Sequence, residues 1–280
     1  MKKLLYLPLL LVAFTANAQQ GVIFKMKYLP GRNYNATTNM TMKVNLTMSG
    51  DNNLAASINP GGGPLDIDMT MSMDGTIKTG AKGADKTFPI AIGYKMGQMN
   101  MTMNGKKIDI PIPTLTSNTT AIYGHIDESG KLKADSIGGA AVKDTSEKSI
   151  AAMMNAIQNA VKFPDRPLKV GDTFEQEMPF SLPVAGTGLS MNAKVTYKLV
   201  SINASNAYFD VNQTMDIKIP VKDDFMTISG TGSGKMVYSI KDSFPTEFKS
   251  DMTLTAKGKV TSLAIDGTAQ FGMEYKYTIN

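Results

Sequence analysis

Methionine is the residue type in this chain with the clearest potential for chemistry. The stretch QMNMTMNG, residues 98–105, places Met99, Met101 and Met103 with one polar residue between successive methionines. Residues two apart in a β-strand lie on one face, roughly 6.6 Å apart, so these thioethers would project side by side. Such a row could bind a soft metal, contact an apolar ligand or fill a core.

The excess of methionine favours the two apolar roles over the metal. Of 21 methionines, 20 follow residue 18, where the chain has 12 leucines. Each methionine in an expected strand shares its face with other apolar residues, so the pattern indicates core filling, a groove for an apolar ligand, or both. Copper(I) sites usually include His or Cys, and the chain has one histidine, no cysteine and methionines spread over many strands.

The remaining polar motifs predict no catalytic set. His125, in YGHIDESG, stands beside a turn, and no nucleophile or orienting carboxylate can be assigned to it from the sequence. The acidic pairs 66/68, 127/128 and 223/224 fall on polar strand faces or in turns. GTGSGK, residues 230–235, is one residue short of a phosphate loop and is flanked by strand patterns, so its alternate glycines indicate a bend. We expect a non-enzyme with no cofactor and no metal.

Alternation of apolar and polar residues dominates the chain and predicts β-strands. The expected strands cover residues 22–28, 40–48, 65–73, 94–103, 108–112, 193–199, 207–211, 215–219, 236–240, 248–256 and 271–279. The alternation slips by one at Gly97-Gln98, which predicts a β-bulge, and Asn104-Gly105 predicts a hairpin turn. The fold class expected is mainly β, with antiparallel curved sheets arranged as a half-barrel or sandwich.

One segment has helical periodicity instead. Between Thr145 and Phe163 the apolar residues are spaced as on an amphipathic helix, with Asp144 as a cap and Pro164 as the stop. The expected organisation is a signal peptide (1–18), an N-terminal β half (19–143), this helix (144–163) and a C-terminal β half (164–280), with the halves packed as one unit.

The first residues, MKKLLYLPLLLVAFTANAQQ, fit a secretory signal peptide with a basic start, an apolar stretch and an Ala16-Asn17-Ala18 cleavage site. We therefore expect export to the periplasm or the cell exterior, and no membrane-spanning segment in the mature chain. The formal charge falls from +5 to +3 without Lys2 and Lys3 and is scattered, so nucleic acid is not an expected partner.

Two stretches resemble a known group of proteins. FPDRPLKVGDTFEQE (163–177) resembles the Pro-x-x-Pro-(Leu/Val)-x-Val-Gly-Asp-(Thr/Ser)-aromatic landmark of uncharacterised secreted β-rich proteins of the Bacteroidota. AIYGHIDESGKLKADSIGG (121–139) is similar to the strand–turn–strand that precedes the helix in such proteins. The resemblance implies a secreted β-rich protein with no assigned reaction. In layout alone, the chain also resembles the helix-closed half-barrels that carry lipids or lipoproteins through the periplasm.

We therefore expect a non-catalytic binding protein that holds a lipid or other apolar ligand in a methionine-rich groove between sheet and helix. The expected ligand-binding residues are Met69, Met71, Met73, Met99, Met101, Met103, Met153, Met154 and Ile157. The main alternative is a structural or interaction module of the cell envelope, with a closed core and a cell-envelope protein as partner. A copper(I)-binding protein and an outer-membrane barrel are more remote alternatives.

Overall fold

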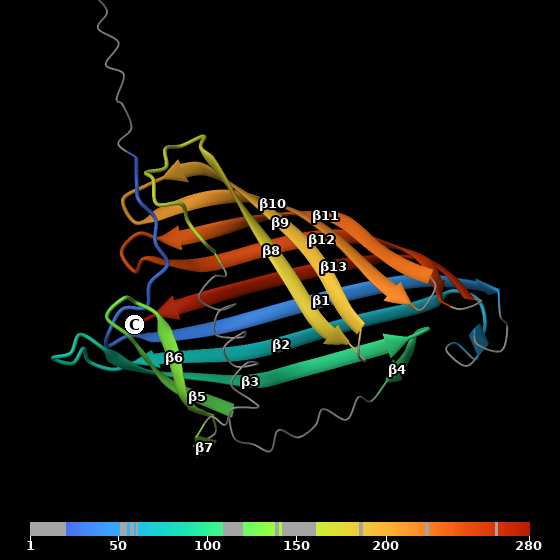
Figure 1. Ribbon diagram of the computed structural model, residues 1–280, viewed down its shortest axis with the longest axis horizontal. Coiled ribbons are helices and arrows are strands. Elements are labelled where there is room, and N and C mark those ends of the chain that lie inside the picture. Colours follow the sequence, from blue (N-terminus) through green and yellow to red (C-terminus); the bar gives the residue numbers. More distant parts are fainter. Residues whose placement is uncertain are drawn as a thin grey trace, which may run out of the picture.

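The chain forms one antiparallel β-sheet, seen in a computed structural model (Figure 1). The structure describes residues 21–50, 55–56, 59, 61–108, 120–137, 140–141, 161–184, 187–221, 224–260 and 263–280. Its strands are β1 (Asn33–Gly50), β2 (Leu65–Thr79), β3 (Phe88–Met103), β4 (Lys106–Ile108), β5 (Thr120–Ile126), β6 (Leu132–Ile137), β7 (Ala140–Ala141), β8 (Thr173–Val184), β9 (Thr187–Ile202), β10 (Asn206–Val221), β11 (Asp224–Ser239), β12 (Phe244–Val260) and β13 (Leu263–Ile279).

The strand order runs β7-β6-β5-β3-β2-β1-β13-β12-β11-β10-β9-β8, with β4 added to β3. The first long strand, β1, pairs with the last, β13, from Tyr34 opposite Ile279 to Gly50 opposite Leu263. This pairing joins the strands that precede residue 143 to those that follow residue 164 in one continuous sheet. The prediction of a mainly β, antiparallel fold is confirmed.

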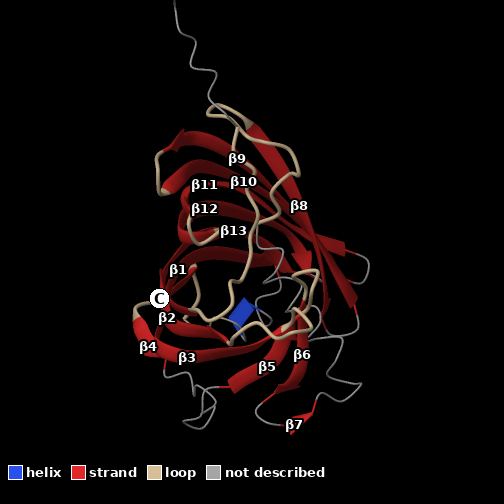
Figure 2. Cartoon of the chain, turned by 90° about the vertical axis from the view of Figure 1, so that its left-hand side faces the viewer, coloured by secondary structure: helices blue, strands red, loops and turns tan. Residues whose placement is uncertain are grey.

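The sheet is open and strongly curved. Viewed from one end, the strands follow a curve from β8 at one edge to β5 and β6 near the other (Figure 2). Glycines that point inward on β11 permit close contact with β12: a Cβ on Gly230 would lie 2.1 Å from the carbonyl oxygen of Thr253 and 2.8 Å from the Cα of Leu254. GTGSGK lies within β11, in mid-strand, as expected for glycines that allow a close backbone approach.

One end of the curved sheet is closed by residues 21–32, named here the end segment. It crosses the inner face and bonds to several elements in turn: Val22 pairs with Leu168, the hydroxyl of Tyr238 donates to the Lys25 carbonyl (2.8 Å), and the Gly31 amide donates to the Gly80 carbonyl (2.9 Å). The expected strand at 22–28 is therefore wrong. The segment is extended and its burial alternates, but its backbone hydrogen bonds go to separate loops, at Leu168, Ser243 and Gly80, rather than to one ladder.

Phe24 of the end segment anchors the first of two cores. Its side chain is 1% exposed, and its ring centroid lies 5.5, 5.3 and 5.1 Å from those of Phe163, Phe209 and Tyr238. Tyr28, further along, packs against Tyr34 and Phe244 in the second core. Both cores lie on the inner face at this end of the sheet.

The predicted bulge and hairpin are both present. Met71 lies opposite Met99 and Met73 opposite Met96, so Gly97 and Gln98 together face the single residue Ser72. Asn104 and Gly105 both have positive φ, 51° and 74°, as a two-residue hairpin turn of the primed type requires. Of the expected return strand 108–112, Ile108 ends β4, and residues 109–112 lie outside the described residues.

The helix expected at 144–163 is not present in the part of it that the structure describes. Residues 161–163 are irregular: the Lys162 amide donates to the side-chain oxygen of Gln176 (2.9 Å), and Phe163 precedes a proline, which disfavours the helical conformation. Residues 144–160, including Met153, Met154 and Ile157, lie outside the described residues. Within the described ranges, no helix has the length and apolar character needed to cross a membrane.

Candidate functional site: the methionine-lined inner face

Strand register places methionines from four neighbouring strands next to one another. β13, β1, β2 and β3 lie side by side in the middle of the sheet (Figure 1). Two rows cross these strands on the inner face, and their members in strand order are Met273, Met40, Met71 and Met99 in the first row and Phe271, Met42, Met69 and Met101 in the second. We name the seven methionines of these two rows the methionine block.

Every methionine of the block points to the same face as the cores. Met40 and Met42 are in phase with the buried Tyr34 on β1, and Met69 and Met71 are in phase with the buried Ile77 on β2. On β3 the bulge shifts the inward-facing positions by one residue, so that the methionines after it face the same side as the buried residues before it. Ile90 and Ile92, before the bulge, are even-numbered, whereas the inward-facing methionines after it are odd-numbered.

The structure brings together the six predicted methionines that it describes. Met69, Met71, Met99 and Met101 belong to the block. Met103 continues the inner face one row further, opposite Ile67, and Met73 lies one row toward the end segment, opposite Thr38.

Sequence reasoning missed three members of the block. Met40, Met42 and Met273 were recognised as inward-facing strand residues but not as site residues. Their alternation was visible in the sequence; their pairing with the predicted methionines required the register of β1 with β2 and β13.

Burial changes along the inner face. Near the end segment the face is a closed core, where Tyr34 is 0% exposed and Phe209 is 1% exposed. Beyond the row that holds Phe248 and Tyr275, whose rings stack at 5.4 Å, the methionines of the block are only half-buried. The same apolar face is therefore sealed near the end segment, half-buried along the methionine block, and buried again at the far end of β2 and β13, where Leu65 and Leu263 are 4% and 1% exposed.

The outer face has the opposite character. Its exposed side chains form cross-strand ion pairs, among them Lys276 with Glu247 (2.8 Å), Lys194 with Glu175 (2.8 Å) and Lys235 with Asp210 (3.2 Å). A hollow of about 500 Å³ on this face, over β10, β11 and β12, is lined mainly by polar residues. Two of its lining residues, Lys235 and Asp210, form an ion pair with each other across β10 and β11.

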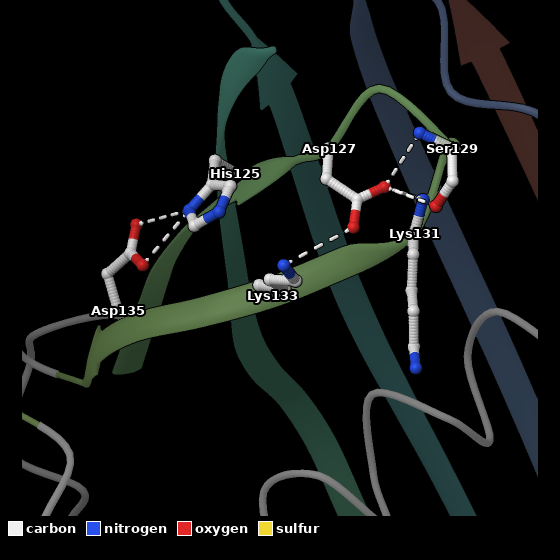
Figure 3. Close-up of polar contacts among 6 residues, drawn as sticks. All are labelled: His125, Asp127, Ser129, Lys131, Lys133 and Asp135. Carbon is white, nitrogen blue, oxygen red and sulfur yellow. Dashed lines mark hydrogen bonds and ion pairs between the residues drawn. The ribbon is translucent and has the colours of Figure 1, made fainter.

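His125 lies in a separate polar cluster on the β5–β6 hairpin (Figure 3). Its Nδ1 lies 3.0 and 3.1 Å from the two carboxylate oxygens of Asp135 on β6. The sequence did not indicate this carboxylate partner. Figure 3 shows that Ser129 contacts Asp127 and not His125. Ser129, His125 and Asp135 therefore do not form a catalytic triad of nucleophile, base and orienting carboxylate.

Asp127 organises the turn of this hairpin. Its carboxylate accepts hydrogen bonds from the hydroxyl of Ser129 (2.5 Å) and the amides of Ser129 (2.9 Å) and Lys131 (3.0 Å), and Lys133 lies 3.4 Å away. These bonds, the Ser129 hydroxyl first, lower the pKa of Asp127 to about 2. The cluster therefore stabilises a turn, as expected for Asp127. Among the described residues, no group of three or more His, Cys, Asp and Glu is placed to hold a metal ion.

No family model and no curated protein matches this sequence. Among solved structures, the chain is similar to one titled "Bacterial polysaccharide outer membrane secretin", with an alignment that covers 89% of this chain and 100% of that chain. The identity is 7% and the TM-score is 0.30. A similarity of this size does not establish a shared fold, and we draw nothing from it about function.

Proposed function

We propose that this chain is an exported, non-catalytic binding protein that holds a lipid or another apolar molecule against the inner face of its sheet. The single observation that carries the proposal is the change in burial along that face, from a sealed core near the end segment to half-buried methionines beyond it.

The size of the accessible face supports a ligand rather than a packing defect. Seven neighbouring strands from β10 to β3 contribute to it. Half-buried apolar side chains on this many adjacent strands form a contiguous, partly exposed apolar surface. Contiguous exposed apolar surface of more than a few hundred Å² marks interaction sites.

The residue type also fits a ligand of variable shape. Methionine is unbranched and polarisable, so a surface built from it can repack around different apolar molecules. Met40 has methionines on both sides in its row, and the same holds for Met71. In this proposal the amphipathic segment 144–163, still a prediction of the sequence, supplies the second wall of the groove. The predicted signal peptide supplies the exported location.

Native mass spectrometry of the purified mature chain tests the proposal, together with titration of a fluorescent apolar dye. We expect co-purifying lipid and saturable dye binding. The double variant Met40→Gln, Met71→Gln should weaken dye binding about 5- to 30-fold, which corresponds to about 1–2 kcal/mol of lost apolar contact.

The matched control lies on the same two strands. Thr41 and Thr70 are directly opposite each other and are exposed on the outer face. The double variant Thr41→Gln, Thr70→Gln should bind the dye like the wild type. If the wild-type chain carries no lipid and binds no dye, the proposal is wrong and the closed-core envelope module takes its place.

A further inference from the structure

The methionine block has a property that an apolar surface does not require: its methionines lie directly opposite one another on adjacent strands. Met40 lies directly opposite Met273 on one side and Met71 on the other, and Met71 in turn lies opposite Met99. Residues directly opposite in antiparallel strands have Cβ atoms about 4.5–5.5 Å apart. Methionine has three rotatable side-chain bonds, so thioethers at these positions can turn toward a common point between them.

The second row adds further neighbouring methionines to those of the first. Met42 lies opposite Met69, and Met69 lies opposite Met101. Along each strand the two rows are separated by two residues, about 6.8 Å. A point between Met40, Met71 and Met69 is therefore within reach of three thioethers from two adjacent strands.

The donor set selects one class of ligand. Thioethers are soft ligands and suit copper(I), whereas calcium and magnesium need oxygen and zinc needs nitrogen, thiolate or carboxylate. The chain has no cysteine, and within the described ranges no cluster of His, Asp or Glu competes for a harder metal. The block is also half-buried, so an ion can reach it from solvent.

We propose that the methionine block binds a soft monovalent cation of the copper(I) class through three or more thioether sulfurs. The wide spacing of methionines along the sequence argued against such a site. The register of β13, β1, β2 and β3 reverses that argument, because residues up to 233 positions apart, Met40 and Met273, become direct neighbours.

This site shares the inner face with the proposed apolar ligand but depends on a different atom. An apolar molecule needs surface and shape, which leucine also provides, whereas the cation needs sulfur. Met→Leu substitutions nearly conserve side-chain volume and remove only the thioether. They therefore separate the two proposals.

Silver(I), which has the same preference for thioethers and does not change oxidation state, is the probe. The mature chain, labelled with ¹³C in the methionine methyl groups, is titrated with silver(I) and followed by NMR. We expect saturable binding with shifts in the methyl signals of the block. Met215 and Met226 should not shift, because they face the inner side but have no methionine directly opposite.

The variants decide the outcome. Met40→Leu, Met69→Leu and Met71→Leu together should weaken silver(I) binding at least 100-fold, because this variant leaves no three neighbouring thioethers in the block. The control variant Met215→Leu with Met226→Leu should bind silver(I) like the wild type. Absence of saturable silver(I) binding, or equal silver(I) binding by the two variants, overturns the cation site and leaves the proposed apolar ligand to its own test.

Discussion

Replacing Phe24 by alanine removes the side chain that fastens the end segment to the sheet. The ring is 1% exposed and contacts three aromatic rings, those of Phe163, Phe209 and Tyr238, at centroid distances of 5.1–5.5 Å. Truncation of a buried phenylalanine to alanine costs about 3–5 kcal/mol, because apolar contact is lost and a cavity remains. We expect the free energy of unfolding to fall by about 4 kcal/mol.

This loss is a large fraction of the total free energy of unfolding. Folded domains are stable by about 5–15 kcal/mol, and for a chain of this size each kcal/mol shifts the melting temperature by about 2–4 °C. The variant should therefore melt about 8–16 °C lower. Urea unfolding followed by far-UV circular dichroism and by tyrosine fluorescence measures the effect, since the chain has ten tyrosines and no tryptophan.

Ile23 provides the control. It is the adjacent residue in the same extended segment, and its side chain is 55% exposed. Ile23→Ala should change the free energy of unfolding by less than about 1 kcal/mol. Equal losses for Phe24→Ala and Ile23→Ala would refute the account of the end segment as a packed closure. If Phe24→Ala does not fold, Phe24→Leu should retain part of the contact and show an intermediate loss.

Two further predictions concern the sheet and the hairpin. Gly230→Ala should lower the free energy of unfolding, measured in urea, by roughly 1–3 kcal/mol or more, because the added Cβ would overlap the carbonyl of Thr253 and push β11 away from β12. The control Ser229→Ala, at the exposed neighbouring position, should be nearly neutral. Equal effects of the two substitutions would contradict the inferred close approach of the strands. The pKa of Asp127 is lowered from 3.8 to about 2, so its contribution to stability is present above about pH 4 and is lost as the pH falls toward 2. The difference in melting temperature between the wild type and Asp127→Asn should shrink over that interval, and a difference that is constant down to pH 2 would contradict the assignment.

The alternation of residues was enough to predict most strands and their inward faces, because one-sided burial imposes a period of two. It also identified the bulge at Gly97-Gln98, where the phase of the apolar residues slips. The same reasoning failed for residues 22–28. Alternating burial requires only that one side of an extended segment packs against the protein and the other faces solvent. The end segment meets this condition without joining the sheet as a strand, since its Val22–Leu168 pair is an isolated bridge.

The sequence alone predicted that the candidate site consists of methionines, but not the full set of methionines that belong to it. Met69, Met71, Met99 and Met101 follow from the inward phase of two strands. Met273 could not be added, because nothing local indicates that the last strand pairs with the first. Long-range pairing is set by the packing of the whole sheet, and the single sequence offers no signal for it.

The pairing of β1 with β13 has a consequence for how the chain reaches its native state. The amide of Asn33 bonds to the carbonyl of Asn280, and the reverse bond closes the same pair, so the two strands are held together out to the last residue. During synthesis β1 is made well before its partner β13. One side of β1 therefore stays without its neighbour until β13 has been made, and contacts of such long range make folding slow. A chain built this way benefits from being kept unfolded until β13 is available to pair with β1.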